Sequence, residues 1–184
     1  MEAVVVKSER TEWDDSHRLR GSLDIPLSDE GVARARSLGE KLGDRPVRSV
    51  YSGFTLSAYQ TARILCHANG RTAVTRMREL DEVNLGLWQG MLELELKRKH
   101  RRAYLRWVRS PEGVAPPMGE PVDRAYRRLV GGFEEILRAN RKARVMTVTG
   151  PYAWTLLVCY LRDQPLSDFW AVFREPKRWE TFQV

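Results

Sequence analysis

The stretch "VVVKSERTEW", residues 4 to 13, places polar side chains directly after a run of valines. Lys7 can bind an anion through its ammonium group, whereas the Ser8 hydroxyl can act as a nucleophile only beside a base. The chain contains three histidines that could supply this base: His17, His67 and His100. Only the segment that holds His17 can approach Ser8, and we expect an exposed loop histidine there. The stretch therefore predicts anion binding without a complete pair of nucleophile and base.

Basic side chains offer candidates for anion binding at two places. The first group surrounds this stretch, as a cationic rim or as solvated surface charges, and consists of Lys7, Arg10, Arg18 and Arg20. The second lies in "LKRKHRRAYLRWVR", residues 96 to 109, where helical spacing puts basic residues largely along one side: Lys97, Arg101, Arg102, Arg106 and Arg109. Because they are interleaved in sequence with Tyr104 and Trp107, these basic side chains could track a nucleic-acid backbone while the aromatic rings stack on bases. The alternative is an amphipathic helix with a solvated polar face.

Short β-branched runs alternate with helical patterns, which is typical of an α/β domain. We expect strands at "AVVVK", "VRSVYS", "RVMTVTG" and "WETFQV". The helix after the first strand has Ser28 as its predicted N-cap and Gly43 near its end. Further helices are expected at "LSAYQTARILCHA", at residues 91–109 and 121–140, and at "YAWTLLVCYL". The pattern predicts one three-layer α/β/α domain over residues 1–184, with a mainly parallel sheet and a helical cap around residues 91–140.

Length and composition narrow the class of protein. A chain of 184 residues can bury a core without disulfides or metal ions. Cys66 and Cys159 lie in apolar stretches without ligand spacing, so we expect buried, reduced thiols and no metal or cofactor. No signal peptide or membrane-spanning run is apparent, which predicts a cytoplasmic protein. The net charge of +7 favours anionic partners.

Five blocks in register resemble the histidine phosphatase, or phosphoglycerate mutase-like, superfamily. They are "TEWDDSHRLRGSLDIPLSDEG", "VYSGFTLSAYQTARIL", "LDEVNLGLWQG", "PPMGEPVD" and "VMTVTG", and together they span nearly the whole chain. The resemblance implies the fold of that superfamily, and its family activity would be phosphomonoester hydrolysis or phosphoglycerate mutase. In that family a histidine attacks phosphorus, two arginines and a second histidine hold the phosphoryl oxygens, and a carboxylic acid protonates the leaving group.

The resemblance also implies that most of this catalytic machinery is replaced. The positions of the family's Arg-His-Gly triplet, second arginine and second histidine hold, in that order, Lys7, Ser8, Glu9, Ser57 and Gly150. Glu82 is retained at the position of the proton donor. We expect Lys7, Ser8, Ser57, Glu82 and Gly150 to converge at the carboxyl edge of the sheet, where open α/β folds bind ligands.

These replacements predict a catalytically inactive protein, a pseudophosphatase that acts as a binding, scaffold or regulatory module. Its expected ligand is an anion or a protein partner, bound without catalytic residues. One alternative is a phosphatase or other hydrolase with a rearranged active site. A second alternative is an accessory protein that associates with nucleic acid.

Overall fold

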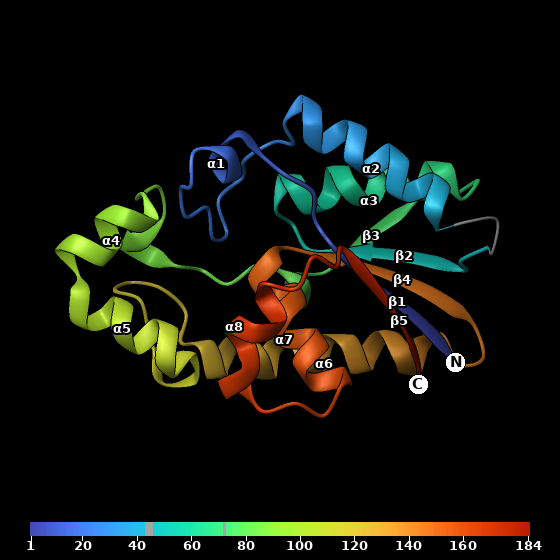
Figure 1. Ribbon diagram of the computed structural model, residues 1–184. Helices are drawn as coiled ribbons and strands as arrows, with labels where there is room; N and C mark the ends of the chain where they lie inside the picture. The colour runs from blue at the N-terminus through green and yellow to red at the C-terminus, as the bar shows by residue number, and fades with distance from the viewer. Residues whose placement is uncertain (43–45, 72) are drawn as a thin grey trace.

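A five-stranded sheet lies between two layers of helices in the computed structural model, which describes residues 1–42, 46–71 and 73–184 (Figure 1). Across those residues the strand order is β3-β2-β4-β1-β5. The strands are β1 (Glu2–Lys7), β2 (Ser49–Ser52), β3 (Val74–Arg76), β4 (Arg144–Thr149) and β5 (Trp179–Gln183). All neighbours pair in parallel except β5, which runs antiparallel to β1. The expected α/β fold with a mainly parallel sheet is confirmed.

Strand β1 is an interior strand that lies between β4 and β5. All six of its residues are buried, which explains why "EAVVVK" reads as a continuous β-branched run rather than an alternating one. Val4 and Val6 face one helical layer, and Ala3 and Val5 face the other. The last residue of β1 therefore delivers the next polar residues to the carboxyl edge of the sheet.

One face of the sheet is covered by α2 (Asp29–Lys41) and α3 (Leu56–Ala68). Ser28 caps α2 as predicted, because its side-chain oxygen accepts the Gly31 N–H at 3.1 Å. Leu38 of α2 and Leu65 of α3 pack with the valines of β1 and β4 in one apolar cluster. Gly43, expected near the end of this helix, lies outside the described residues.

The other face is covered by α6 (Val122–Ala139), α7 (Pro151–Leu161) and the short α8 (Phe169–Phe173). Helix α7 begins directly after β4, with Pro151 in its first turn, where a missing N–H costs nothing. Connections contain the short helices α1 (Glu12–Asp15), η1 (Arg78–Leu80), η2 (Gly86–Trp88), η3 (Pro111–Gly113) and η4 (Leu166–Asp168). None of the helices in the described parts of the chain is long and apolar enough to cross a membrane.

Two helices, α4 (Glu93–Lys99) and α5 (Arg101–Arg109), project beside the sheet layers at the left of Figure 1. The single helix expected over residues 91–109 is wrong, because the backbone breaks at His100, with φ −125° and ψ 41°. Lys97 consequently belongs to a different helix from Arg101. The expected cap around residues 91–140 also included the residues of α6. This helix instead lies in the same helical layer as α7.

Aromatic side chains join these two helices to the rest of the molecule. Trp107 of α5 is buried and contacts the rings of Trp88, Tyr152 and Trp170 at centroid distances of 5.6 to 5.8 Å. The indole N–H of Trp170 also donates to the Trp107 carbonyl at 2.6 Å. Trp107 is therefore the main apolar anchor of α5.

Candidate active site

The carboxyl ends of β1 and β4 bring the first candidate residues together. The Ser8 N–H donates to the carbonyl of Thr149, the last residue of β4, at 2.7 Å. Gly150 follows Thr149 and is the N-cap residue of α7. Ser8 and Gly150 therefore lie on adjacent strands at the same edge, as the sequence predicted.

Arg20 is buried beside Ser8 rather than on an exposed rim. It is 5% exposed, and its Nη2 donates to Ser8 Oγ at 3.1 Å. Its Nη1 lies 3.3 Å from Oδ2 of Asp14, an oxygen that also accepts the Thr11 N–H at 2.7 Å. Because these partners compensate for burial of the guanidinium, the loop can hold a cation within the site.

The other residues of the expected rim are placed differently. Arg10 pairs with Asp15, and the exposed Arg18 donates to the Gly90 carbonyl at 2.7 Å. His17 is exposed, as expected for a loop histidine. Of the four rim candidates, Arg20 and Lys7 are the two that the structure buries at the edge of the sheet.

Glu82 lies buried against the amino terminus of α7. Its Oε1 accepts the N–H groups of Val83 at 2.7 Å and Ala153 at 2.8 Å, and its Oε2 accepts the Tyr152 N–H at 2.9 Å. Burial raises the pKa of this carboxyl to about 7, although the three backbone donors and the charge of Arg20 act in the opposite direction. Glu82 can therefore exchange a proton near neutral pH, which a general acid requires.

Gly150 provides the space that Glu82 occupies. A Cβ atom at position 150 would lie 2.7 Å from Cδ and 2.9 Å from Cβ of Glu82. The backbone of Gly150 has φ −68°, which any residue can adopt, so the close approach of Glu82 is the constraint. The glycine at this position thus allows the carboxylate to reach the helix terminus.

The side chains of Lys7 and Glu9 point to opposite faces of the sheet. The ammonium group of Lys7 lies 4.3 Å from the centre of the Trp154 ring, and burial lowers the pKa of Lys7 to about 8. Glu9 instead faces the α2 and α3 layer, and its N–H donates to Thr61 Oγ1 at 3.1 Å. The Thr61 hydroxyl donates in turn to the Ser57 carbonyl. Thr61 therefore links the backbone of Ser57 to the backbone of Glu9.

A cavity of about 430 Å³ opens beside Glu82 and adds basic residues that the sequence did not single out. Its wall includes Arg78, Arg124 and Arg128. Arg124 and Arg128 are four residues apart on α6, a spacing that puts them on one face, but only the fold brings that face to Glu82. Arg128 is fixed by Glu120, at 2.7 and 2.9 Å.

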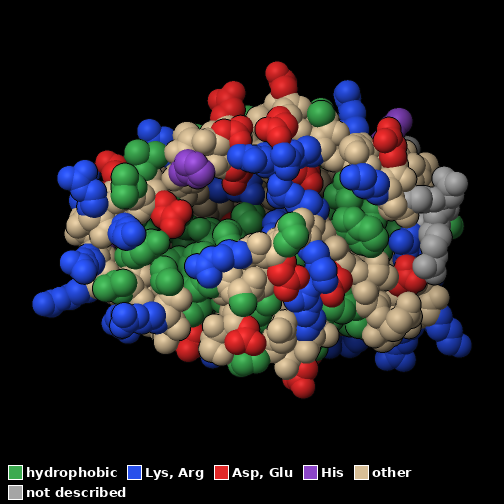
Figure 2. Space-filling model, viewed as in Figure 1, with side chains coloured by type: hydrophobic (Ala, Val, Ile, Leu, Met, Phe, Trp, Pro, Cys, Tyr) green, Lys and Arg blue, Asp and Glu red, His purple; other side chains and the backbone are tan. Residues whose placement is uncertain are grey.

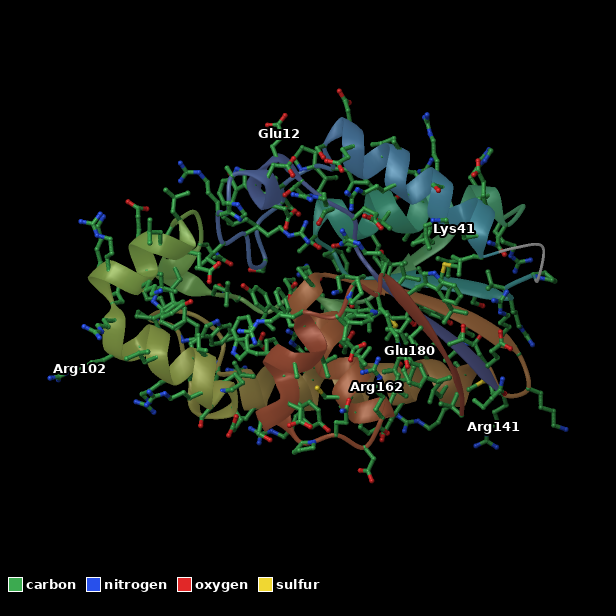
Figure 3. The ribbon with its side chains drawn as sticks, in the orientation of Figure 1. Glu12, Lys41, Arg102, Arg141, Arg162 and Glu180 are labelled. Atoms are coloured by element: carbon green, nitrogen blue, oxygen red, sulfur yellow. The ribbon has the colours of Figure 1, made fainter. Side chains whose placement is uncertain are left out.

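The basic residues of α5 lie away from this edge. In Figure 3, Arg102 points outward from the far end of the helical pair. Arg101 and Arg102 are exposed, whereas Arg106 donates to the Gly113 carbonyl at 3.2 Å. Binding of nucleic acid by this face stays a prediction.

Comparison with known proteins identifies the family of this chain. Residues 10–180 match the histidine phosphatase superfamily (branch 1), and the chain belongs to this superfamily. It is 29% identical over 168 residues to phosphoserine phosphatase 1 of Hydrogenobacter thermophilus, covering 91% of this chain and 79% of that protein. It is also 29% identical to a metal-independent phosphoserine phosphatase of Arabidopsis thaliana, covering 91% and 70%. A solved mycobacterial glucosyl-3-phosphoglycerate phosphatase is 26% identical, with a TM-score of 0.83 over 92% of this chain and 86% of that chain.

These relatives contradict the prediction of a catalytically inactive binding or scaffold protein, because they are named for phosphatase activity. They favour the alternative, a phosphatase with a rearranged active site. The physical reason is that phosphoryl transfer depends largely on positioning and on electrostatic stabilisation. The buried Arg20, Lys7 and Glu82 can supply those two effects.

Proposed function

We propose that this protein is a phosphatase that hydrolyses small phosphomonoesters at an active site rebuilt without histidine. The observation that carries the proposal is the pairing of a proton donor and an anion-binding group at one sheet edge. Glu82 is buried and has a pKa of about 7. The guanidinium of the buried Arg20 binds Ser8 and is close enough to Glu82 for its charge to act on that carboxyl.

Three groups of this edge are suited to hold the phosphoryl oxygens. Arg20 offers a planar guanidinium, and Lys7 offers an ammonium group at the end of β1. Ser8 Oγ accepts a hydrogen bond from Arg20, so its own proton is free to be donated to a phosphoryl oxygen. Donors fixed in place before the reaction stabilise developing negative charge at little cost in reorganisation.

Hydrolysis then proceeds by attack of water on phosphorus. The bond between phosphorus and the ester oxygen breaks, and protonated Glu82 gives its proton to that leaving oxygen. The oxygen of the attacking water stays on phosphorus, and both of its protons stay at first on the phosphate product. The ionised Glu82 then regains a proton from the phosphate or from solvent before the next turnover. Ser8 serves as a hydrogen-bond donor in this scheme, because its side-chain hydrogen-bond partner within the described residues is Arg20 rather than a base.

The substrate class follows from the cavity beside Glu82 and from the relatives. Arg128 is already paired with Glu120. Asp81 also borders this cavity, but Arg78 and Arg124 form no ion pair within the described residues and could bind a second negative group of a substrate. Relatives named for phosphoserine and for glucosyl-3-phosphoglycerate support a small phosphorylated metabolite with a carboxylate. Phosphoserine is therefore the substrate to test first.

The test compares two substrates that differ in the leaving group. Wild-type protein should release phosphate from phosphoserine, and Glu82→Gln should lower kcat/KM by about 100-fold or more, the lower range for a lost general acid. With p-nitrophenyl phosphate the loss should be much smaller, because p-nitrophenolate leaves without protonation. Arg20→Gln should lower kcat/KM for both substrates.

Arg127→Gln is the matched control, since this exposed arginine of α6 forms only a surface pair with Asp123. Its activity should equal that of wild type. Absence of turnover by wild-type protein, or turnover that Glu82→Gln and Arg20→Gln leave unchanged, would refute the proposed site.

A further inference from the structure

A second basic cavity, of about 460 Å³, lies on the α2 side of the sheet next to β5. Arg34 and Lys41 of α2 line one wall, and Lys177 and Arg178 line the other. None of these four residues borders the cavity beside Glu82. Figure 3 places Lys41 near the carboxyl end of α2, close in this view to the strand that carries Glu180. The two cavities therefore have separate walls, although Glu9 directly follows Ser8 and its carbonyl accepts a hydrogen bond from Arg20 at 3.4 Å.

Two of these four basic side chains are available to bind a ligand. Arg34 pairs with Glu30 at 2.6 Å, and Lys177 lies near two carboxylates, the closer one that of Glu180 at 3.4 Å. Within the described parts of the chain, neither Lys41 nor Arg178 forms an ion pair. Unpaired cations on facing walls of a cavity favour occupation by an anion.

Glu9 supplies an independent sign of a missing partner. Its side chain borders this cavity and is 1% exposed, yet its Oε2 has no hydrogen-bond partner. A buried carboxyl oxygen without a partner is costly, so a ligand that brings a hydrogen-bond donor, such as a hydroxyl group on its organic part, would stabilise the site. Burial raises the pKa of Glu9, and in its protonated form the carboxyl can donate a hydrogen bond to an anion.

Hydrogen bonds from Arg162 fix the position of the segment that contains Lys177 and Arg178. Arg162 binds Glu175 through two bonds of 2.6 and 2.8 Å, and it binds Glu180 at 2.5 and 3.2 Å. Figure 3 shows Arg162 and Glu180 near one another in this view. Because Glu175 and Glu180 flank the segment, these bonds fix it before any ligand arrives.

We infer that this cavity is an accessory binding site for a phosphorylated organic anion about the size of a nucleotide. The phosphoryl oxygens would lie between Lys41 and Arg178, which line facing walls of the cavity. Trp179, which also borders the cavity, offers an aromatic surface for the organic part. The volume exceeds what inorganic phosphate alone would fill. No bond of the ligand is broken in this site.

Calorimetric titration at low salt tests the inference with two probes that resist hydrolysis. Methylenediphosphonate should bind, and adenosine 5′-(α,β-methylene)diphosphate should bind more tightly because its base can pack on Trp179. Lys41→Gln and Arg178→Gln should each weaken binding about tenfold, as expected for one charge-assisted hydrogen bond. Arg127→Gln should bind as wild type does, because Arg127 borders neither cavity.

The protonation of Glu9 gives a second readout, with sulfate as a probe whose charge stays constant. The charged groups that act on Glu9 are Arg178, Arg34, Lys7 and Arg10, and all of them stabilise its ionised form. If the ligand needs a protonated Glu9, sulfate affinity should fall as the pH rises through the pKa of this carboxyl. Glu9→Gln should still bind sulfate but lose this pH dependence.

Three results would overturn the inference. The first is a wild-type protein that binds neither diphosphonate at low salt. The second is unchanged affinity in both Lys41→Gln and Arg178→Gln. The third is loss of binding in Arg20→Gln alone, which would place the anion at the proposed catalytic edge instead and would leave the phosphatase proposal standing.

Discussion

At the scale of residues, Glu82 and Gly150 form a complementary pair. The sequence identified both positions, because the blocks around them are in register with the superfamily. It could not show that the carboxylate fills the space over Gly150 and binds the amides of Tyr152 and Ala153. Such a contact joins residues 68 positions apart and depends on the side-chain conformation rather than on any local pattern.

Gly150→Ala should therefore destabilise the protein, although its backbone conformation suits alanine. The added Cβ would displace Glu82 from its buried hydrogen bonds, at a cost of about 1–3 kcal/mol. In a Glu82→Gly background the cost should shrink to within about 0.5 kcal/mol, because every side-chain atom that meets the added Cβ is then removed. Denaturant unfolding of the four proteins measures this coupling.

The matched control is Gly131→Ala in α6, where an added Cβ meets nothing within 4 Å. This change should stabilise the protein by about 0.5–1 kcal/mol, since alanine is the better helix former. Equal effects at positions 131 and 150, or additive effects of Gly150→Ala and Glu82→Gly, would contradict the proposed contact.

The raised pKa of Glu82 should also make stability depend on pH. The folded protein keeps the Glu82 proton up to about pH 7, whereas the unfolded chain releases it near pH 4.5. The contribution is complete below pH 4.5 and is lost as the pH rises toward 7, by about 3 kcal/mol in total. The difference in unfolding free energy between wild type and Glu82→Gln should therefore decrease over this range. A difference that stays constant with pH would show that Glu82 titrates normally.

At the scale of elements, the strongly patterned segments were predictable, whereas β3 and the break between α4 and α5 were not. The buried valine run of β1 and the capped helix after it appear where the sequence placed them. Strand β3 has only three residues, two of them exposed, so it carries no apolar pattern to detect. The break at His100 escaped prediction because the charged residues on both sides keep helical spacing through it.

Helix α5 should depend on Trp107 for its attachment. Trp107→Ala should lower the unfolding free energy by about 3–5 kcal/mol, the range for removing a buried tryptophan. Leu105→Ala on the same helix should change it by less than about 0.5 kcal/mol, because Leu105 is exposed. Thermal unfolding followed by circular dichroism measures both, and similar losses at the two positions would contradict this assignment.

At the scale of the whole molecule, positive charge gathers in several places with different environments. Figure 2 shows basic side chains along the hollow in the middle of this face, with apolar side chains within it. The net charge predicted anionic partners, and the fold distributes the charge between the cavity beside Glu82, the cavity beside Glu9 and the outer face of α5. Composition alone could not separate these places, because each is assembled from segments distant in the sequence.

The pH profile of phosphoserine hydrolysis tests the central claim most directly. If protonated Glu82 is the general acid, kcat/KM should be highest below about pH 7 and fall about tenfold per pH unit above it. The fall should steepen above about pH 8, where Lys7 loses its charge. Glu82→Gln should show low activity without the first decline. A wild-type protein that releases no phosphate at any pH, or one whose profile Glu82→Gln leaves unchanged, would contradict the account.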